Sequence, residues 1–507
     1  MYLGIDFGTS FSQVATIYLD SPLLLLSPGE YGIPSVFYYD DLNDILVGQD
    51  ALDAGQGNDA ANLITEVKMK LHNPYVVLGN KVFPTKEIVR EIIKYIVQRA
   101  IQIAKTRSIS TKIEGVVLCI PAKFGMQERG LIYEAARQCL KELPASELRA
   151  LGVQPGEGLC ISDIIKEPVA AALSYYRTEA ENNKRILVYD LGGGTCDIAL
   201  IRADESLMEH YDVEDSDMIR LGGRDWDQRL VNHIANQLKN VAKIDVMGNP
   251  GYEEKVRRAA ITVKHKLSDP SKTRAIAQIE INGRMYPIQI QRNVFDEITC
   301  DLLRNTLDCL QSVYDRCPNS ADIRDIICVG GSSNMLQVQE GIRNRFPQCN
   351  VKVHMPEHAV VNGAAAYAEM LAGNKGSGIQ VSDIASFSYG VKIFWDYNKD
   401  PNHEVISNIL FKGSKLPASH VKPYSPVANT SSLVFRIYES DCTREYYELT
   451  EPSMRYIGQV ILNVPGMTPS TSVNCQIQLN CQGMLEATVT HPNGKRETVP
   501  INLNELG

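Results

Sequence analysis

LVYDLGGGTCDIALI, residues 187–201, places three consecutive glycines between two runs of strand-forming residues, with Asp190, Thr195 and Asp197 around them. A two-residue Asn-Gly or Asp-Gly turn would be enough for a plain hairpin. Three glycines followed by a hydroxyl indicate that a ligand approaches the backbone closely, because successive glycine N–H groups can form a nest for an anion. A loose loop between two strands is the alternative, since glycine turns are common.

The start of the chain repeats this arrangement. YLGIDFGTSFSQVATI, residues 2–17, runs from an apolar strand through Asp6, Gly8, Thr9 and Ser10 into a second apolar strand. A second copy favours the anion-binding interpretation over the loose loop. Two such hairpins predict two related lobes.

Length and charge limit the possible classes of protein. A chain of 507 residues exceeds the size of one hydrophobic core, so we expect two or more domains. The net charge of −9 argues against a nucleic-acid or anionic-membrane surface, which needs clustered Lys and Arg. No apolar run approaches the 18 or so residues of a membrane span, and no basic flank of a signal peptide precedes the first strand. We therefore predict a cytoplasmic protein without a membrane span.

The cysteines and histidines do not form a recognisable metal or disulfide pattern. The 12 cysteines are scattered through apolar segments, which favours buried free thiols over disulfides. No CxxC motif occurs, and Pro356 lies between His354 and His358, which prevents them from sharing a helical face. We expect no transition-metal site built from protein ligands.

Several segments between the two hairpins and beyond them have clear periodicity. Residues 84–107 predict a packing helix, residues 115–124 a buried strand, and residues 164–176 a helix started by Pro168. Glutamate is a poor helix cap, so the carboxylate of Glu167 is either free for chemistry or a solvated charge at the helix start. Residues 325–346 predict a strand, a glycine turn with serines and a helix, which is a third candidate phosphate or nucleoside contact.

From residue 372 on, the pattern of apolar and polar residues changes. AGNKGSGIQ, residues 372–380, has the composition of a linker. Beyond it, apolar residues alternate with polar ones between Pro-Gly, Gln-Gly and Asn-Gly turns. This pattern predicts a β-sandwich of about 120 residues with almost no helix.

Six motifs together resemble the seventy-kilodalton heat-shock chaperones of the DnaK type: GIDFGTS, KEPVAAAL, DLGGGTCDIAL, LGGRDWD, VGGSS and GMLEATV. The resemblance implies a multidomain protein with an α/β, actin-like ATPase of two ribonuclease H-like lobes at residues 1–373. It further implies an interdomain linker at 374–383 and an all-β substrate-binding sandwich at 384–507. ATP and Mg²⁺ would lie between the lobes, and the sandwich would hold extended apolar peptides.

The same resemblance assigns the site residues. Asp6 and Asp190 would hold Mg²⁺, largely through its waters, as that cation prefers. Lys68 matches the catalytic lysine, although Lys70 lies two residues on, and Glu167, Asp197 and Thr195 would complete the catalytic set. The residues implied to contact the nucleotide are Gly8, Thr9, Ser10, Gly192, Gly193, Gly194, Thr195, Gly222, Gly223, Lys264, Ser268, Gly330, Gly331 and Ser332, and those implied to line the peptide groove are Ile406, Leu433 and Phe435.

The sequence also departs from the family pattern. Ile261 replaces an acidic ribose ligand, Asn334 replaces an arginine that stacks on adenine, and Arg224 replaces an acidic residue after the paired glycines. The first two predict weaker nucleoside binding, and we assign no consequence to Arg224. The linker keeps only Ile379, Val381 and Asp383 of an acidic-leucine cluster, and the sequence ends soon after the sandwich, so we expect weak interdomain signalling and no helical lid.

Three hypotheses follow for the function. The first is a lidless ATP-hydrolysing chaperone that binds apolar peptides and works with a J-domain co-chaperone and a nucleotide-exchange factor. The second is a non-hydrolysing nucleotide-binding co-chaperone or scaffold, against which the intact catalytic set argues. The third, a sugar or acetate kinase with the same actin-like core, fails because such kinases lack the C-terminal β-sandwich.

Overall fold

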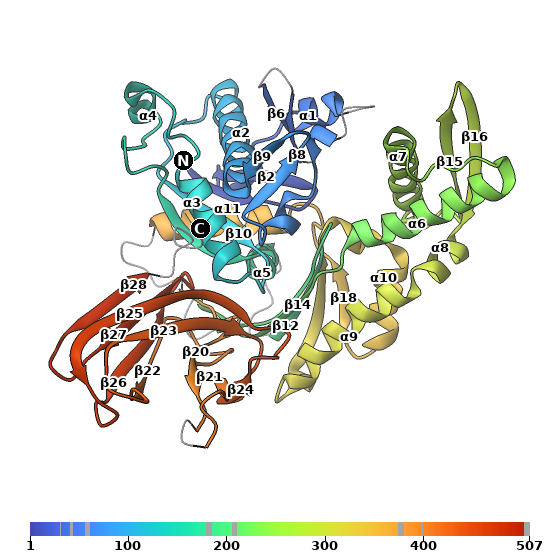
Figure 1. Cartoon of the computed structure of the whole chain (residues 1–507). Coiled ribbons are helices and arrows are strands. Elements are labelled where there is room, and N and C mark those ends of the chain that lie inside the picture. The colour runs from blue at the N-terminus through green and yellow to red at the C-terminus, as the bar shows by residue number, and fades with distance from the viewer. Residues whose placement is uncertain are drawn as a thin grey trace. The chain divides into compact units, whose positions relative to one another are not determined.

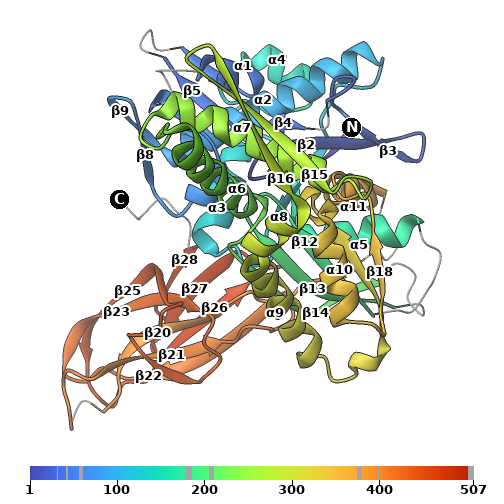
Figure 2. The ribbon, with the colours of Figure 1, turned by 90° about the vertical axis from the view of Figure 1, so that its right-hand side faces the viewer.

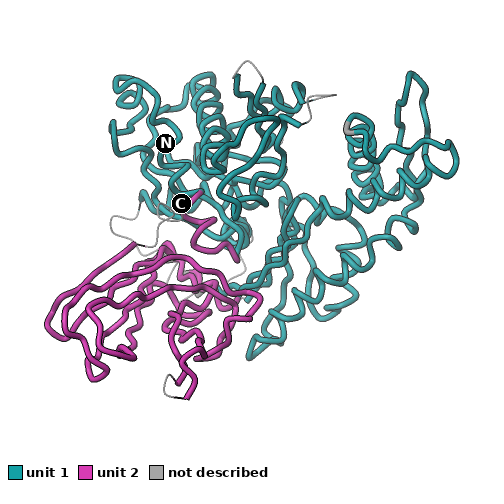
Figure 3. Tube along the Cα trace, in the orientation of Figure 1, with its two compact units in different colours: residues 1–122, 132–209, 216–379 teal, residues 123–131, 210–215, 380–507 magenta. Residues whose placement is uncertain are grey.

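A computed structural model describes residues 1–30, 32–40, 44–55, 61–178, 185–204, 210–373, 380–396 and 399–500. The chain divides into two compact units (Figure 3). Unit 1 comprises residues 1–122, 132–209 and 216–379, and unit 2 comprises residues 123–131, 210–215 and 380–507. The domain boundaries expected from the resemblance, at 1–373, 374–383 and 384–507, stay a prediction.

The first sheet of unit 1 is built around the N-terminal hairpin. The two strands of this hairpin pair antiparallel, with Asp6 opposite Gln13, and two parallel strands follow beside the first one (Figure 1). The order is β11-β10-β1-β2-β3, and β4 pairs with β2. Its strands are β1 (Tyr2–Asp6), β2 (Phe11–Tyr18), β3 (Ser21–Leu24), β4 (Ile33–Pro34), β10 (Gly115–Ile120) and β11 (Ile161–Lys166).

The second sheet of unit 1 repeats this topology around the glycine-rich hairpin. Asp190 lies opposite Asp197 in the antiparallel pair β12 and β13, and two parallel strands again follow beside the first strand. The order β18-β17-β12-β13-β14 matches that of the first sheet. The predicted pair of related lobes is therefore confirmed. The strands are β12 (Arg185–Leu191), β13 (Cys196–Asp204), β14 (His210–Ile219), β17 (Ile323–Val329) and β18 (Asn350–Val353).

Two helices with small residues pack tightly beside the sheets. A Cβ on Gly363 of α11 would collide with the carbonyl of Ala170 in α5, and a Cβ on Gly4 of β1 would collide with the backbone of Ala365. These close approaches need glycine, which agrees with the packing role that the small residues of α11 predict. These two helices are α5 (Glu167–Thr178) and α11 (Ala359–Gly373). The other helices up to residue 150 are α1 (Gln49–Ala54), α2 (Thr85–Thr106), α3 (Met126–Arg137) and α4 (Ala145–Ala150).

The remaining helices of unit 1 surround a core centred on the second sheet, in which Trp226 is fully buried. The two views agree that α7 lies along the β15–β16 hairpin (Figures 1 and 2). The elements are α6 (Gly223–Gln237), α7 (Pro250–Leu267), β15 (Arg274–Ile281), β16 (Arg284–Gln291), α8 (Arg292–Ile298), α9 (Cys300–Arg316) and α10 (Leu336–Arg345).

Smaller elements of unit 1 lie between the first hairpin and α2, and a further 3₁₀ turn lies between β17 and α10. The 3₁₀ turn η2 carries the two candidate lysines, and a second 3₁₀ turn, η5, carries the serines after the third glycine turn. These elements are β5 (Phe37–Tyr39), β6 (Ile45–Val47), β7 (Leu63–Ile64), η2 (Val67–Lys70), β8 (Tyr75–Leu78), β9 (Lys81–Pro84) and η5 (Gly331–Asn334).

Unit 2 is a β-sandwich, as predicted. Every regular element that the structure describes at residues 380–396 and 399–500 is a strand, and the two sheets have the orders β24-β21-β20-β23-β25 and β22-β26-β27-β28. Alternating apolar residues of both sheets form one core. The strands are β20 (Ser388–Phe394), β21 (Glu404–Leu410), β22 (Ala418–Tyr424), β23 (Thr430–Ser440), β24 (Tyr446–Glu448), β25 (Arg455–Met467), β26 (Val473–Leu479), β27 (Leu485–Thr490) and β28 (Arg496–Pro500).

Two segments from earlier in the sequence belong to unit 2 because of specific contacts. Arg455 pairs with Glu128 at 3.0 Å and with Glu439 at 3.2 Å, and the Met126 N–H donates to Glu439. The strand β19 (Gln380–Ser382) pairs in parallel with the start of β14, at residues 210–212. Ile379 and the rest of the predicted linker up to residue 379 lie outside the described residues.

The predictions for the helix after Pro84 and for the cysteines are also confirmed. α2 begins at Thr85 directly after Pro84, and its apolar face, including Ile88 and Ile92, is buried. All 12 cysteines are free thiols, most of them buried. None of the described helices combines the length and the apolar character that crossing a membrane requires.

Candidate nucleotide site

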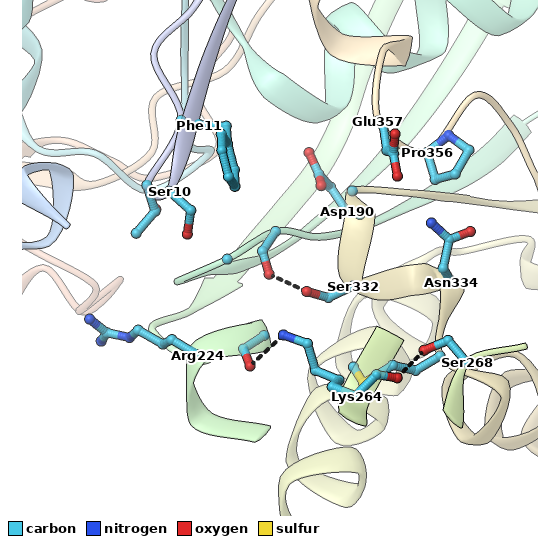
Figure 4. Close-up of a pocket in the computed structure, with 18 of the residues that line it drawn as sticks. Ser10, Phe11, Asp190, Arg224, Lys264, Ser268, Ser332, Asn334, Pro356 and Glu357 are labelled. Atoms are coloured by element: carbon cyan, nitrogen blue, oxygen red, sulfur yellow. Dashed lines mark hydrogen bonds between the residues drawn. The ribbon is translucent and has the colours of Figure 1, made fainter. Parts of the chain in front are cut away.

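Unit 1 contains a cavity of about 820 Å³ at the tips of the two related hairpins. Ser10 and Phe11 lie across the cavity from Ser332 and Asn334 (Figure 4). The cavity brings together most of the residues that the resemblance assigns to nucleotide and metal: Asp6, Gly8, Thr9, Ser10, Lys68, Glu167, Asp190, Gly192, Gly193, Thr195, Gly223, Lys264, Ser268, Gly330, Gly331 and Ser332. A volume of this size lies in the range of small-molecule sites.

The hairpin tips approach each other closely at one end of the cavity. A Cβ on Gly193 would meet the Ser10 hydroxyl at 2.7 Å, and a Cβ on Gly194 would meet the Thr9 methyl at 2.9 Å. Gly330 has φ +79°, and a Cβ there would meet the Asp190 carboxylate at 2.5 Å. These positions require glycine, because a side chain there would collide with a neighbouring residue. The two hairpin tips therefore border the same part of the cavity. We call this end of the cavity the phosphate end.

Of the two candidate catalytic lysines, Lys68 and Lys70, Lys68 is the one that lines the cavity. It is 4 % exposed and pairs with Glu167, which is 7 % exposed, whereas Lys70 faces solvent. Glu167 is the first residue of α5, directly after β11. The solvated-charge interpretation of Glu167 is therefore wrong, because burial and the ion pair with Lys68 hold the carboxylate inside the protein.

Carboxylates outnumber the cations around Lys68. Desolvation, reinforced by the Glu167 carboxylate, raises the pKa of Asp6 and that of Asp197 to about 7. The same causes raise the pKa of Asp190 above its usual range. Desolvation alone would lower the pKa of Lys68, but the carboxylates of Glu167 and Asp6 outweigh it and raise that pKa. The phosphate end therefore has the electrostatics of a site that gains from binding a cation.

The carboxylates of the described residues do not form a metal cage by themselves. In the part of the chain that the structure describes, no three His, Cys, Asp or Glu side chains are grouped to hold a metal ion. Asp6 and Asp190 both line the cavity. A Mg²⁺ ion fits this arrangement, because it is usually bound through one or two carboxylates, water and substrate phosphates.

Three of the assigned residues support the cavity from behind its wall. Asp197 is 1 % exposed and accepts a hydrogen bond from the Ala122 N–H at 2.6 Å. Gly222 lies against the backbone of Gly193 and Gly194, where a Cβ would come within 2.7 Å of both. Asp197, Gly194 and Gly222 are not among the residues that line the cavity.

The opposite end of the cavity, which we call the nucleoside end, is built from α7, η5 and the start of α11. Lys264 donates to Asp227 at 2.8 Å and to the Gly223 carbonyl at 3.1 Å. Ser268 and Ser332 donate to the carbonyls of Lys264 and Gly192 (Figure 4). These polar side chains are held in place by the protein itself.

The residues that depart from the family pattern also line the cavity. Ile261 contributes an apolar side chain, and Asn334 an amide, at the nucleoside end. Arg224 lines the phosphate end and pairs with Glu66 at 2.9 Å. Sequence reasoning singled out Arg224 without finding its partner. It missed further lining residues: Gln13, Asp227, His265, Asp269, Gln339, Pro356 and Glu357.

The residues assigned to a peptide groove lie within the sandwich. Phe435 is 6 % exposed in the core, where its ring contacts that of Tyr424 at 5.9 Å between centroids, and Leu433 packs against the same core. Ile437 also lies in this core. Ile406 is fully buried opposite Tyr447. The groove assignment of Ile406, Leu433 and Phe435 stays a prediction.

A family model described as Hsp70 protein matches residues 2–502. The chain belongs to the Hsp70 family.

Similar proteins are found in distant organisms. The chain is 27% identical to heat shock cognate 70 kDa protein 3 of Dictyostelium discoideum, over 100% of this chain and 80% of that protein. It is 27% identical to the chaperone protein HscA of Buchnera aphidicola, over 99% of this chain and 94% of that protein. It is 28% identical to the chaperone protein DnaK of Thermotoga maritima, over 87% of this chain and 70% of that protein. The resemblance inferred from the motifs is confirmed at low identity.

Proposed function

We propose that this Hsp70-family chain is an ATP-dependent chaperone that hydrolyses ATP slowly in unit 1 and binds extended apolar peptides in unit 2. One observation carries the enzymatic half of this proposal. The tips of both hairpins and the buried Lys68–Glu167 pair meet at the phosphate end of one cavity. The match of the family model over both units supports the chaperone half.

The phosphate end supplies donors for a transferred phosphoryl group. Backbone N–H groups of residues 193–195 and the hydroxyls of Thr9, Ser10 and Thr195 would bind phosphate oxygens, whereas the Gly192 N–H donates to the Thr195 carbonyl at 3.0 Å. The Lys68 ammonium would neutralise the negative charge that develops on the phosphoryl oxygens in the transition state. This kind of hydrolysis needs positioning and charge stabilisation rather than a covalent nucleophile.

Asp6 and Asp190 would hold Mg²⁺ at this end. A cation held by these two carboxylates would supply positive charge that offsets the charge of the phosphate oxygens. Glu167, held by Lys68, would orient the attacking water, and Asp197, held behind the cavity wall by the Ala122 N–H, would position the Thr195 hydroxyl. Their role as positioning groups is supported by burial, which restricts the directions that each carboxylate can take.

The sandwich would bind peptide by adding an extended segment through backbone hydrogen bonds and apolar pockets. Such binding selects apolar unfolded segments rather than one sequence. We propose a J-domain co-chaperone and a nucleotide-exchange factor as partners by analogy with the family. A cytoplasmic location is consistent with the 12 free thiols, since disulfides form in oxidising compartments.

The residues that line the nucleoside end favour a second candidate function. Ile261 and Asn334 line it where the family pattern has charged nucleoside ligands. A chain that binds ATP for structure and has lost hydrolysis, acting as a co-chaperone or scaffold, would tolerate these replacements. The buried Lys68–Glu167 pair argues for hydrolysis.

The two functions differ in turnover. We expect the purified full chain with Mg²⁺ to convert ATP to ADP repeatedly, and a fluorescent extended apolar peptide to bind to the same preparation. Removal of Mg²⁺ by EDTA serves as the control. ATP binding without any turnover supports the scaffold, and the absence of both ATP and peptide binding contradicts both functions.

A further inference from the structure

Arg224 and Glu66 form an ion pair between the two sides of the phosphate end. Nη1 of Arg224 lies 2.9 Å from Oε2 of Glu66, although 158 positions separate them in the sequence. Glu66 directly precedes the turn that carries Lys68, and Arg224 is the second residue of α6. The Arg224 side chain extends away from Lys264 and Ser332 (Figure 4). It therefore points out of the nucleoside end and toward the other side of the cavity.

Arg224 is fixed to the glycine-rich tip, and Glu66 is fixed to the turn that carries Lys68. The Arg224 N–H donates to the Gly193 carbonyl at 2.9 Å, directly beside the glycine-rich tip. Glu66 has φ 57°, in the left-handed region, and its carbonyl accepts a hydrogen bond from the Met69 N–H at 2.9 Å. The following residues Val67 and Lys68 are buried. Movement of either side of the cavity would therefore move the partner that it carries.

We propose that the Arg224–Glu66 pair holds the two sides of the phosphate end together and slows the release of bound nucleoside diphosphate or triphosphate. The inference rests on the proposed nucleotide function and assigns a role to the residue that departs from the family pattern. Ser10 and Thr9 of one hairpin already lie against Gly193 and Gly194 of the other. Phosphates held between these tips leave only after the tips separate, and separation breaks the ion pair.

The size of the effect follows from the exposure of the pair. The two side chains are 29% and 32% exposed, so solvent screens their attraction. Partly exposed ion pairs contribute modestly, and we expect loss of this one to accelerate release about two- to fivefold. High salt should accelerate release from the wild-type chain and have less effect once the pair is removed, because salt screens such pairs.

A different role for Arg224 predicts a different pattern. If its guanidinium bound a phosphate directly, neutralising Glu66 would free Arg224 for that contact and slow release. In the proposed role, neutralising either partner accelerates release. The Glu66→Gln variant separates the two roles because it keeps the positive charge of Arg224 in place.

The test measures dissociation of a fluorescent ADP analogue from the full chain by stopped flow, in the presence of Mg²⁺. The variants are Glu66→Gln, Arg224→Gln, the double variant of both, and the charge exchange Glu66→Arg with Arg224→Glu. We expect each single variant to release the analogue about two- to fivefold faster, the double variant to equal the single ones, and the exchange to recover only part of the wild-type rate, because its new carboxylate would lie beside Asp225, which is 3.8 Å from the Arg224 guanidinium. Arg258→Gln removes an exposed pair with Glu254 on α7 and serves as the matched control, with no change expected.

The outcomes distinguish this inference from the proposed function. Unchanged or slower release from Glu66→Gln overturns the inference, even if Arg224→Gln releases faster. Additive effects in the double variant also overturn it, because partners in one ion pair act together. A wild-type chain that binds no nucleotide overturns the proposed function and this inference with it, whereas normal binding with equal release rates in all variants overturns the inference alone.

Discussion

Residue assignments made from the sequence have different outcomes in the cavity of unit 1 and in the sandwich of unit 2. In the cavity, residues assigned from loop motifs come together at two hairpin tips. In the sandwich, Phe435 and Leu433, which the family resemblance assigns to a peptide groove, pack in or against the core. A loop of glycines, hydroxyls and aspartates has few purposes besides holding a ligand. A strand with alternating apolar residues must bury one face in any sandwich. The same pattern therefore fits a peptide groove and a core, and it does not tell which of the two its apolar residues line.

The largest expected effect tests the sandwich side of this comparison. Phe435→Ala should lower the free energy of unfolding of unit 2 by about 3–5 kcal/mol, because it removes a buried ring from the core. The chain has two tryptophans, Trp226 in unit 1 and Trp395 in unit 2. In a Trp226→Phe background, guanidinium unfolding followed by Trp395 fluorescence therefore reports on unit 2.

Val434→Ala is the matched control for Phe435. Val434 is 45% exposed, opposite Ile461 on the outward face, and its truncation should change the unfolding free energy by less than about 1 kcal/mol. If Phe435→Ala instead weakened peptide binding and left stability unchanged, the ring would serve a groove and the contrast between the two units would disappear.

Lys68→Ala tests the cavity side. The substitution should lower the rate of ATP hydrolysis by about a hundredfold or more and leave nucleotide bound, since it removes one preorganised charge from the transition state. Phosphate release from the variant and the wild-type chain measures this. Lys70→Ala is the control, because Lys70 faces solvent two residues away. Equal rates of ATP hydrolysis in Lys68→Ala and wild type would contradict the assignment of Lys68. A loss of hydrolysis in Lys70→Ala alone would show that Lys70 is the active lysine.

Ile261→Glu tests the nucleoside end of the same cavity. A carboxylate at this position should tighten ATP binding by roughly 1.5–3 kcal/mol, because it can accept a hydrogen bond from a ribose hydroxyl. Isothermal titration calorimetry on the wild type, Ile261→Glu and the uncharged Ile261→Gln gives the comparison. Unchanged or weaker binding in Ile261→Glu would show that other residues have rebuilt this end of the pocket.

The smallest expected effect concerns communication between nucleotide and peptide. The linker keeps few of the family's apolar residues, and we expect ATP to change the peptide off-rate by less than about tenfold, a coupling below roughly 1.4 kcal/mol. Dissociation of a fluorescent peptide with ATP, with ADP and without nucleotide measures it. A much larger acceleration by ATP would show that the short strand β19, with Val381, is a sufficient linker. Val381→Asp should then abolish the acceleration.

Much of the fold could be predicted because its signals are local. The two hairpins, α2, the glycine turn before α10 and the sandwich strands each follow from periodicity and turn residues within one segment. The position of Lys68 rather than Lys70 became clear only in the structure, where Lys68 is buried against Glu167. The alternative that Glu167 is a solvated charge failed for the same reason.

The contacts that sequence reasoning missed join distant segments. Arg224 meets Glu66, and the segment at residues 123–131 joins the sandwich through Glu128, Glu439 and Arg455. No periodicity or spacing predicts which charged side chains pair over such separations, because packing of whole elements decides their proximity. The motif residues were identified, but their partners were not.

Single-turnover release of labelled phosphate from ATP is the most direct test of the central claim that the cavity of unit 1 hydrolyses Mg²⁺-ATP. The full chain, in excess over ATP, should release phosphate slowly with Mg²⁺ and stop when the ion is removed. A stable complex that keeps its ATP intact in the presence of Mg²⁺, with and without an apolar peptide, would contradict hydrolysis and leave a nucleotide-binding scaffold.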